Sequence, residues 1–356
     1  MKIGVFGSSW DPEVLALEQR IINRGVECVT INFSQFPRDL PLTITNDAIL
    51  VNEFNLLELD AAYLRSSGGR YPDLMKFDER GNLIPIKFDS SAESKRKRQE
   101  FTHYVQKEKA DRTIRQAVLH AFQCRRPLIN PLRPNSLHRL KPFLFHKLRK
   151  HGIPVPKFIV ASDGESLLGF SKSNAYNRAQ TVVKPLAGIF KTELQTEQEW
   201  EKGVWKTRGA FYQTLIEGDT IRCYVLNDRV IAAAKILFHG TVDSSLSQTG
   251  IEVIDLPPQA AQMARSSVRI LDTQFCGIDL MREKRTDKYY VIDCNFSPMF
   301  VNFARLSKND IPAMIAEHLI RLAQQDYKRS PKGVSLLREV KELLTSDREI
   351  RRRLGL

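Results

Sequence analysis

Oxygen-bearing side chains end two apolar segments that follow each other near the C-terminal end of the sequence. Asp279 ends the run FCGID, and Asp293 and Asn295 end the run YYVIDCN. Residues two apart in a strand point to the same face, so Asp293 and Asn295 share a face and Cys294 turns to the other. Mg²⁺ prefers carboxylate and amide oxygens and keeps further positions for water and phosphate. The spacing therefore predicts a Mg²⁺ site, with a strand-end turn capped by Asp293 or Asn295 as the alternative.

Cationic side chains stand in apolar surroundings earlier in the chain. Lys184 in TVVKPLAG comes where a strand ends, so its ammonium group could reach a phosphate, and Lys141 in HRLKPFLFHKL could approach the same phosphate. Arg222 is a lone cation in the apolar run TIRCYVL, where an unpaired charge would be costly. Taken alone, each lysine is also typical of a surface position. Taken alone, Arg222 is also typical of a structural salt bridge.

Alternating strands and helices must position these side chains. The opening pattern predicts strands at 2–7 and 27–31 with a helix over 12–23 between them, and further strands follow at 47–51 and 61–64. We therefore expect an N-terminal α/β lobe over residues 1–130.

A long basic helix is expected at 91–126, with ten Lys and Arg against four Asp and Glu. Phe101, Tyr104, Val118 and Phe122 recur at helical spacing, which predicts that one face packs on the lobe. The run Lys95–Arg98 is interpreted as a solvated helix end, with an anion contact as the alternative.

The rest of the chain is expected to form two α+β lobes and a tail. The central lobe spans 131–210 and the C-terminal lobe spans 211–328, with helices ending at His151, near 196–204, over 257–271 and over 311–325. A basic helical tail spans 329–356. We interpret the tail as a surface helix. Alternatively, it could bind a partner subunit, cover the active site or bind an acidic substrate.

Composition limits the class of protein. The length of 356 residues predicts two or three lobes, and the net charge of +13 suits an anionic partner. The N-terminal residues do not read as a signal peptide and no apolar run reaches the length of a membrane span, so a cytoplasmic protein is expected. Five scattered cysteines without a metal-binding spacing predict buried thiols.

The order of the motifs points to a family. Lys141 is followed by VVKPLAG, YQTLIEG, TIRCYVLNDRVIAAA, CGIDLMRE and VIDCNFSP. This order resembles the ATP-grasp superfamily, and within it the RimK-like carboxylate-amine ligases, which include microviridin-type peptide ligases. The resemblance covers residues 130–325 and is most specific from Arg222 onward. It implies an α/β (α+β) ATP-grasp fold, in which an N-terminal lobe precedes two α+β lobes that clasp ATP.

The resemblance also implies roles for residues. Lys141 and Lys184 would contact the phosphates of ATP, and Glu217 or Asp219 would meet the ribose. A hinge would hold the adenine largely through backbone groups; its residues are Gln213, Thr214, Leu215 and Ile216.

The implied cofactors are ATP and Mg²⁺, with Mn²⁺ as a substitute. The metal ligands would be Asp279, Asp293 and Asn295, and Arg222 would stabilise the charge that develops during phosphoryl and acyl transfer.

The leading functional hypothesis is therefore a carboxylate-amine ligase that forms an amide or peptide bond through an acylphosphate. Its substrates would be amino acids, peptides or proteins, without a membrane or nucleic acid, and a homo-oligomer is an open alternative to a monomer. Asp293 stands where the ligases commonly have Glu, and YYVIDCN also resembles the last strand of ATP-grasp inositol polyphosphate kinases. A kinase acting on a polyanionic small molecule is thus the second hypothesis, and a nucleotide-gated protein that binds nucleic acid is the third.

Overall fold

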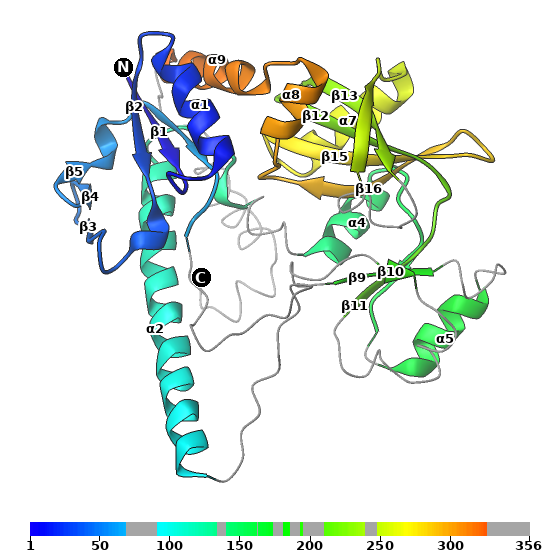
Figure 1. Ribbon diagram of the computed structural model, residues 1–356, viewed down its shortest axis with the longest axis horizontal. Helices are drawn as coiled ribbons and strands as arrows, with labels where there is room; N and C mark the ends of the chain where they lie inside the picture. The colour runs from blue at the N-terminus through cyan, green and yellow to red at the C-terminus, as the bar shows by residue number, and fades with distance from the viewer. Residues whose placement is uncertain are drawn as a thin grey trace, which may run out of the picture.

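The structure is a computed structural model that describes residues 1–68, 91–133, 140–161, 163–173, 181–185, 193–194, 210–238 and 248–325. The described strands form four sheets, with helices packed against them (Figure 1). The mixed α/β class predicted from the sequence is confirmed. The predicted helix near 196–204 and the tail at 329–356 lie outside the described residues.

The N-terminal part is built on a parallel sheet with the strand order β2–β1–β6–β7. These strands are β1 (Lys2–Phe6), β2 (Glu27–Ile31), β6 (Ala61–Leu64) and β7 (Leu128–Ile129). A small antiparallel sheet and two 3₁₀ helices follow β2: η1 (Phe33–Gln35), β3 (Leu42–Ile44), β4 (Ile49–Val51), β5 (Phe54–Asn55) and η2 (Leu56–Glu58). Because the four parallel strands run in one direction, their carboxyl ends meet at a single edge, where Arg65 and Asn130 lie.

Helix α1 (Pro12–Ile22) begins with strong local signals. The Asp11 carboxylate accepts a hydrogen bond from the Glu13 backbone N–H at 2.9 Å, and Pro12 occupies the first turn, where no N–H is needed. Apolar side chains one turn apart are buried against the sheet; they are Val14, Leu17 and Ile21.

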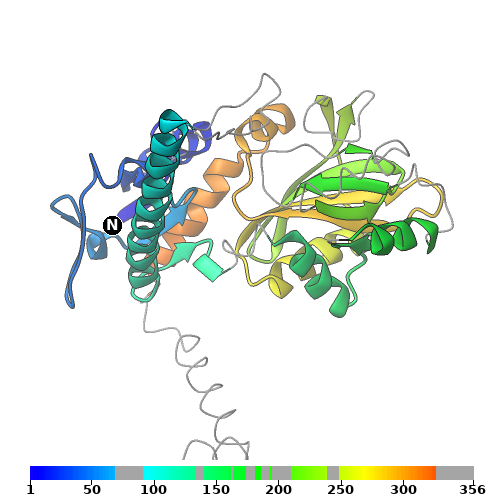
Figure 2. The same ribbon diagram turned by 90° about the horizontal axis from the view of Figure 1, so that it is seen from below.

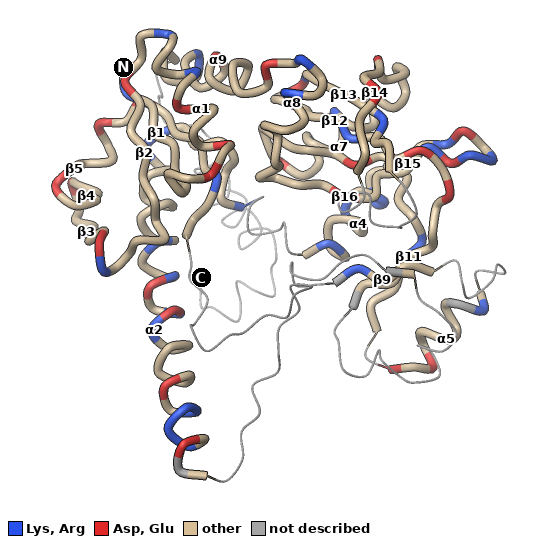
Figure 3. Tube along the Cα trace, in the orientation of Figure 1, with Lys and Arg blue, Asp and Glu red and all other residues tan. Residues whose placement is uncertain are grey.

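Helix α2 (Ala92–Gln123) packs through its C-terminal part. The side chains of Val118, Leu119 and Phe122 are fully buried, whereas Ile114 is 40% exposed. Basic and acidic residues are interspersed along the helix (Figure 3), and Arg96 and Lys97 form ion pairs with Glu100 and Glu93 one turn away at 2.9 and 2.5 Å. The basic run is thus partly neutralised within the helix, as a solvated helix end would be.

Two antiparallel sheets follow. The first has the order β10–β9–β11–β8, and the second has the order β14–β13–β12–β15–β16. The segments around the first are α4 (Lys141–Lys150), β8 (Phe158–Ile159), α5 (Gly164–Ser173), β9 (Thr181–Pro185), β10 (Glu193–Leu194) and β11 (Ala210–Thr214). Those around the second are β12 (Gly218–Leu226), β13 (Arg229–Phe238), β14 (Gln248–Val253), α7 (Pro258–Ile270), β15 (Phe275–Glu283), β16 (Tyr289–Asn295), α8 (Val301–Ser307) and α9 (Ile311–Gln324).

The five-stranded sheet is covered on both faces. One face packs on α4 and α7, which lie on the same side of the sheet in Figure 2. On the other face, Tyr224 and Phe275 join a hydrophobic cluster that also contains residues of β1, α1, β6, α8 and α9. Helix α9 spans from α1 to this sheet at the top of Figure 1. The first and last described elements of the chain therefore share one core, which we call the joint core.

One expectation about the site strands is wrong. The sequence predicts that Asp279 ends its strand, but β15 continues to Glu283. The continuation has a partner on each side, because Met281 lies opposite Thr220 of β12 and Tyr290 of β16. At Asp279 the strand does not end; the pairing of β15 with β16 instead shifts its register between Asp279 and Leu280. The division into lobes at 130, 210 and 328 stays a prediction.

Of the helices that the structure describes, none combines the length and the apolar character needed to cross a membrane. Among the five cysteines, three are buried on the α7 side of the sheet and Cys28 is half-buried, where burial raises the pKa of its thiol to about 12. Cys124 is exposed because it caps α2 beyond the last packed turn. The prediction of buried thiols is therefore wrong for Cys124.

We expect Cys124 to be the single fast-reacting thiol of the native protein. The thiolate is the reactive species and must be reached by the reagent, whereas Cys28 is half-buried and the other three thiols are buried. Titration with a coloured disulfide reagent should show a fast phase that Cys124→Ser removes, and the remaining thiols should react only after denaturation. A fast phase that persists in Cys124→Ser would contradict this expectation.

Candidate active site

Three predicted site residues form a row across the five-stranded sheet. Asp279 of β15 lies opposite Arg222 of β12 on one side and Asp293 of β16 on the other. The Arg222 guanidinium donates through Nε and Nη2 to the Asp279 carboxylate, and the Nη2–Oδ2 distance is 2.8 Å. Burial alone would lower the pKa of Arg222, but Asp279 raises it above its ordinary value. The salt bridge that the sequence left as an alternative is thus present, and it places the cation beside the predicted metal ligand.

Both predicted lysines reach β16 from outside the sheet. Lys141, the first residue of α4, donates from Nζ to Oδ2 of Asp293 at 2.9 Å. Lys184 of β9 donates from Nζ to the carbonyl oxygen of Ile292 at 2.8 Å, and its side chain is buried. Burial alone would lower the pKa of Lys141, but the Asp293 carboxylate raises it. The two ammonium groups therefore meet at the strand that carries Asp293.

Asn295 ends β16 opposite Gly277 of β15. Its Oδ1 accepts a hydrogen bond from the Ser297 backbone N–H at 3.0 Å, which is the capped turn that the sequence offered as an alternative. Gly277 allows Pro298 to fold back over the sheet, because a Cβ at Gly277 would lie 2.9 Å from the Pro298 Cβ. An amide oxygen has two lone pairs, so the Asn295 oxygen can hold this turn and still accept a cation.

The side chains present fit a Mg²⁺–nucleotide pair in their chemistry. No three His, Cys, Asp or Glu side chains of the described residues gather as a metal site. Mg²⁺ does not need such a set, because one or two carboxylates, waters and substrate phosphates commonly bind it. Asp279, Asp293 and Asn295 would hold it, with Lys141 and Lys184 beside the phosphates.

The predicted adenine hinge offers unsatisfied polar atoms. Oε1 of Gln213 and Oγ1 of Thr214 are buried without a hydrogen-bond partner among the described residues. Gln213 is on the same face of β11 as Phe211, which lies opposite Lys184. Leu215 and Ile216 are half-buried. A buried polar atom without a partner, such as Oε1 of Gln213, fits a polar heterocycle better than a plain apolar core.

The other two predicted nucleotide residues have partners of their own. Glu217 is exposed, and its carbonyl oxygen accepts from the Lys284 backbone N–H at 2.9 Å. Asp219 pairs with Lys235 at 2.8 Å. Their contact with a ribose stays a prediction.

Two residues that hold the site strands were not predicted from the sequence. Asn130 is fully buried after β7 and makes four hydrogen bonds: its Nδ2 donates to the carbonyl oxygens of Phe275 and Phe296 at 2.5 and 2.6 Å, and its Oδ1 accepts from the N–H groups of Gln274 and Phe275 at 2.9 and 2.7 Å. Arg65, after β6, contacts the segment that follows Asn295. Both follow apolar strands of the parallel sheet, and a polar residue in that position was the available signal.

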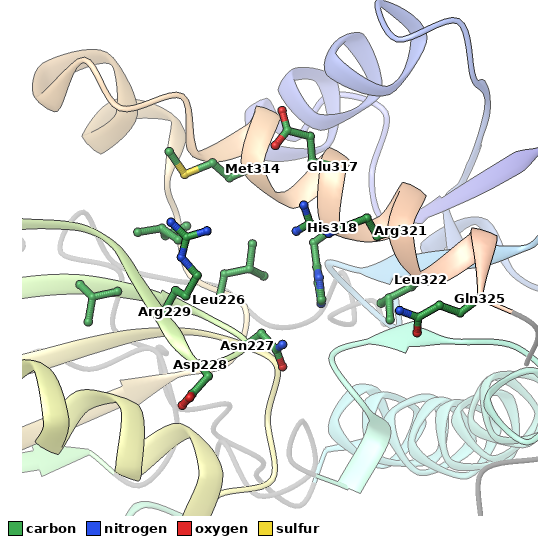
Figure 4. A pocket seen from close by; sticks show the side chains of 12 residues that line it. Leu226, Asn227, Asp228, Arg229, Met314, Glu317, His318, Arg321, Leu322 and Gln325 are labelled. Atoms are coloured by element: carbon green, nitrogen blue, oxygen red, sulfur yellow. The ribbon is translucent and has the colours of Figure 1, made fainter.

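A cavity of about 610 Å³ lies elsewhere, between the β12–β13 turn and α9 (Figure 4). Arg229, His318 and Arg321 are among its lining residues, and none of the predicted site residues lines it. The His318 ring is buried, and burial and the Arg321 charge lower its pKa. The row of Arg222, Asp279 and Asp293 therefore does not belong to this cavity.

Comparison with solved structures identifies the fold. The ATP-grasp ligase PsnB, in complex with a phosphomimetic variant of a minimal precursor, Mg and ADP, superposes with a TM-score of 0.74 at 23% identity, covering 90% of this chain and 98% of that chain. The macrocyclase MdnC from Microcystis aeruginosa MRC, bound to the precursor peptide MdnA, has a TM-score of 0.69 at 15% identity, covering 90% and 99%. The protein has the ATP-grasp fold.

The sequence of the region that contains the site shows to which family the chain belongs. The profile of the RimK-like ATP-grasp domain matches residues 141–319, which is half of the chain. The chain therefore belongs to the RimK-like ATP-grasp family, as the order of motifs indicated. The match begins at Lys141 and includes the row and Lys184.

Curated relatives are similar over the same region. A probable alpha-L-glutamate ligase of Trichodesmium erythraeum (strain IMS101) is 28% identical over 166 residues, which is 46% of this chain and 50% of that protein. One of Xanthomonas oryzae pv. oryzae (strain MAFF 311018) is 26% identical over 179 residues, which is 50% of this chain and 54% of that protein. The chain thus spans about half the length of the curated relatives that it matches.

Proposed function

We propose that the protein is an ATP-dependent carboxylate-amine ligase that requires Mg²⁺. The observation that carries this proposal is the meeting of Lys141 and Lys184 with the row of Arg222, Asp279 and Asp293 at β16. Membership of the RimK-like ATP-grasp family supports it.

The side chains of the site would have different roles, which depend on their charge. Bound ATP and Mg²⁺ would supply the phosphoryl group and the charge that holds it. Lys141 and Lys184 would neutralise phosphate oxygens, and Asp279, Asp293 and Asn295 would hold the metal. Arg222, held by Asp279, would stabilise the negative charge that develops on the carbonyl oxygen when an amine attacks the activated carboxylate and phosphate leaves. Preorganised cations suit this chemistry, which needs positioning more than a side-chain nucleophile.

For the substrate we propose a peptide or protein, or an amino acid such as glutamate. The curated relatives are named glutamate ligases, and PsnB and MdnC were solved with precursor peptides. Trp10 and Met299, which flank the residues bonded by Arg65 in sequence, are 75% and 69% exposed and would be available to a peptide. A cytoplasmic location, a homo-oligomer and the use of Mn²⁺ in place of Mg²⁺ stay predictions.

The kinase hypothesis rests on Asp293 in place of a longer Glu and on the net charge of +13. The family match and the names of the curated relatives favour the ligase over it.

The ligase proposal is tested with hydroxylamine as a surrogate amine. The protein is incubated with ATP, Mg²⁺ and hydroxylamine together with glutamate, or with a peptide rich in Asp and Glu, and hydroxamate and ADP are measured. An activated carboxylate is captured as hydroxamate, so we expect equal amounts of hydroxamate and ADP, and neither product from Asp293→Asn.

Two outcomes would contradict the proposal. ADP release with the phosphoryl group recovered on a hydroxyl of the acceptor would favour the kinase. ATP binding without any turnover, with glutamate and with the acidic peptide, would favour a binding protein.

A further inference from the structure

Arg65 connects the N-terminal sheet to the segment that leaves the site. Its Nη1 donates to the carbonyl oxygen of Ser297 at 2.5 Å, to the Ser297 Oγ at 3.0 Å and to the carbonyl oxygen of Pro298 at 3.3 Å. The Ser297 hydroxyl in turn donates to the Arg65 carbonyl oxygen at 2.8 Å. Arg65 is thus joined to Ser297, 232 positions away in the sequence, by three hydrogen bonds and to Pro298 by a fourth. Ser297 and Pro298 are the second and third residues after Asn295, which ends β16.

Two carboxylates at the start of α1, those of its capping residue Asp11 and of Glu13, hold Arg65 in place. Its Nε donates to Oδ2 of Asp11 at 2.8 Å, and its Nη2 lies 3.4 Å from Oε2 of Glu13. The other oxygen of Glu13, Oε1, accepts from the backbone N–H groups of Phe300 and Val301 at 3.2 and 3.4 Å, so Glu13 caps α8. Glu13 is 3% exposed and the Arg65 side chain 13%, which protects the contacts from competition by water.

The segment held in this way also holds the Asn295 side chain. The Ser297 backbone N–H donates to Oδ1 of Asn295 at 3.0 Å. Ser297 therefore stands between Arg65 and the amide oxygen assigned to the metal. A shift of Ser297 would rotate this oxygen, because the Asn295 side chain makes no other hydrogen bond among the described residues.

We propose that Arg65, fixed by Asp11 and Glu13, is a positioning residue that orients Asn295 for Mg²⁺ through Ser297. The proposal rests on the proposed function, since it requires Asn295 to be a metal ligand. Partners that orient metal ligands commonly change metal affinity or activity by about 10- to 100-fold when they are removed.

An ion pair between the residues after α1 and helix α9 supplies a matched control. Arg24, in the turn that follows α1, pairs with Glu317 of α9 at 2.6 Å, so Arg24→Ala also removes an arginine pair between distant parts of the chain. Unlike Arg65, Arg24 has no hydrogen bond to the 295–301 segment among those of the described residues.

The experiment compares the affinity for ADP with saturating Mg²⁺ and with EDTA by calorimetry, in the full-length wild type, Arg65→Ala, Arg65→Lys and Arg24→Ala. We expect Mg²⁺ to strengthen ADP binding in the wild type and in Arg24→Ala. In Arg65→Ala this gain should shrink by about tenfold or more, while metal-free ADP binding stays unchanged. Arg65→Lys keeps the positive charge, but its single ammonium nitrogen cannot replace the guanidinium group that bonds Asp11 and Ser297 together. We therefore expect Arg65→Lys to show most of the decrease in Mg²⁺ gain that Arg65→Ala shows.

An unchanged Mg²⁺ gain in Arg65→Ala would overturn the proposal, as would full recovery in Arg65→Lys, which would assign the effect to charge alone. Equal weakening of ADP binding with and without metal would assign Arg65 a purely structural role. If Arg65→Ala does not fold, Ser297→Ala removes the hydroxyl link alone and should shift the Mg²⁺ gain in the same direction; no shift would overturn the proposal. If the wild type itself gains nothing from Mg²⁺, the proposed metal site fails, and this inference falls with it.

Discussion

Replacing Asp279 or Asp293 by asparagine should lower Mg²⁺-dependent ATP turnover by about two orders of magnitude or more. Each substitution keeps the shape of the side chain and removes the negative charge that the proposed metal site needs. Each also releases a cation, because Asp279 neutralises Arg222 and Asp293 neutralises Lys141. Turnover is measured as ADP release at saturating ATP and Mg²⁺, and circular dichroism checks that the fold is kept.

Asp287→Asn is the matched control for these variants. Asp287 lies in the turn between β15 and β16, its side chain is 72% exposed, and it pairs with Arg282 at 2.9 Å. Its φ of 56° is one that asparagine tolerates, so the same chemical change is made in the same hairpin without strain. We expect wild-type turnover in Asp287→Asn; turnover that survives in Asp279→Asn or Asp293→Asn would refute the metal assignment.

The largest loss of stability is expected from Asn130→Ala. The substitution removes the partner of two N–H groups, at Gln274 and Phe275, and of two carbonyl oxygens, at Phe275 and Phe296; of these, the Phe275 oxygen keeps a hydrogen bond from the Thr273 hydroxyl at 3.3 Å. An unsatisfied buried group costs about 1–3 kcal/mol, and part of this cost relaxes, so we expect the free energy of unfolding to fall by about 3–5 kcal/mol. Urea denaturation followed by circular dichroism measures it.

Two further variants sharpen this test. Asn130→Asp keeps the acceptor for Gln274 and Phe275 but places an oxygen against two carbonyl oxygens, so it should also destabilise the protein. Asn302→Ala changes an exposed asparagine of α8 and should alter the free energy of unfolding by less than about 0.5 kcal/mol. A loss in Asn130→Ala as small as in Asn302→Ala would show that solvent or rearrangement replaces the four hydrogen bonds.

The parts of the fold that could be predicted are those with local signals. Helix α1 carries its cap and its apolar spacing within a dozen residues, and the strand at Glu27–Ile31 has the bounds that the sequence predicts. The site row could also be anticipated, because Arg222, Asp279 and Asp293 each stand in a recognisable apolar strand.

What could not be predicted depends on contacts between distant segments. Asn130 meets Phe275, 145 residues away, and Arg65 meets Ser297, 232 residues away. Neither residue stands in a pattern of its own, since β7 has two residues and β6 four. The continuation of β15 beyond Asp279 likewise depends on pairing with β12 and β16, which the apolar run alone does not encode.

The joint core limits how this protein can be recombined with relatives. Val14 and Leu17 of α1 lie in the same cluster as Ile315 and Leu319 of α9, although the two helices are at opposite ends of the described chain. The family match ends at 319, inside α9, so a graft that follows the matched region would divide that cluster between two parents. The sheet of β8–β11 has its own small cluster, with Leu167 and Tyr212 as its buried residues. A chimaera should therefore inherit α1 and α9 from one parent, whereas none of the described residues of β8–β11 belongs to the joint core, and their link to the second sheet includes the contact of Lys184 with Ile292.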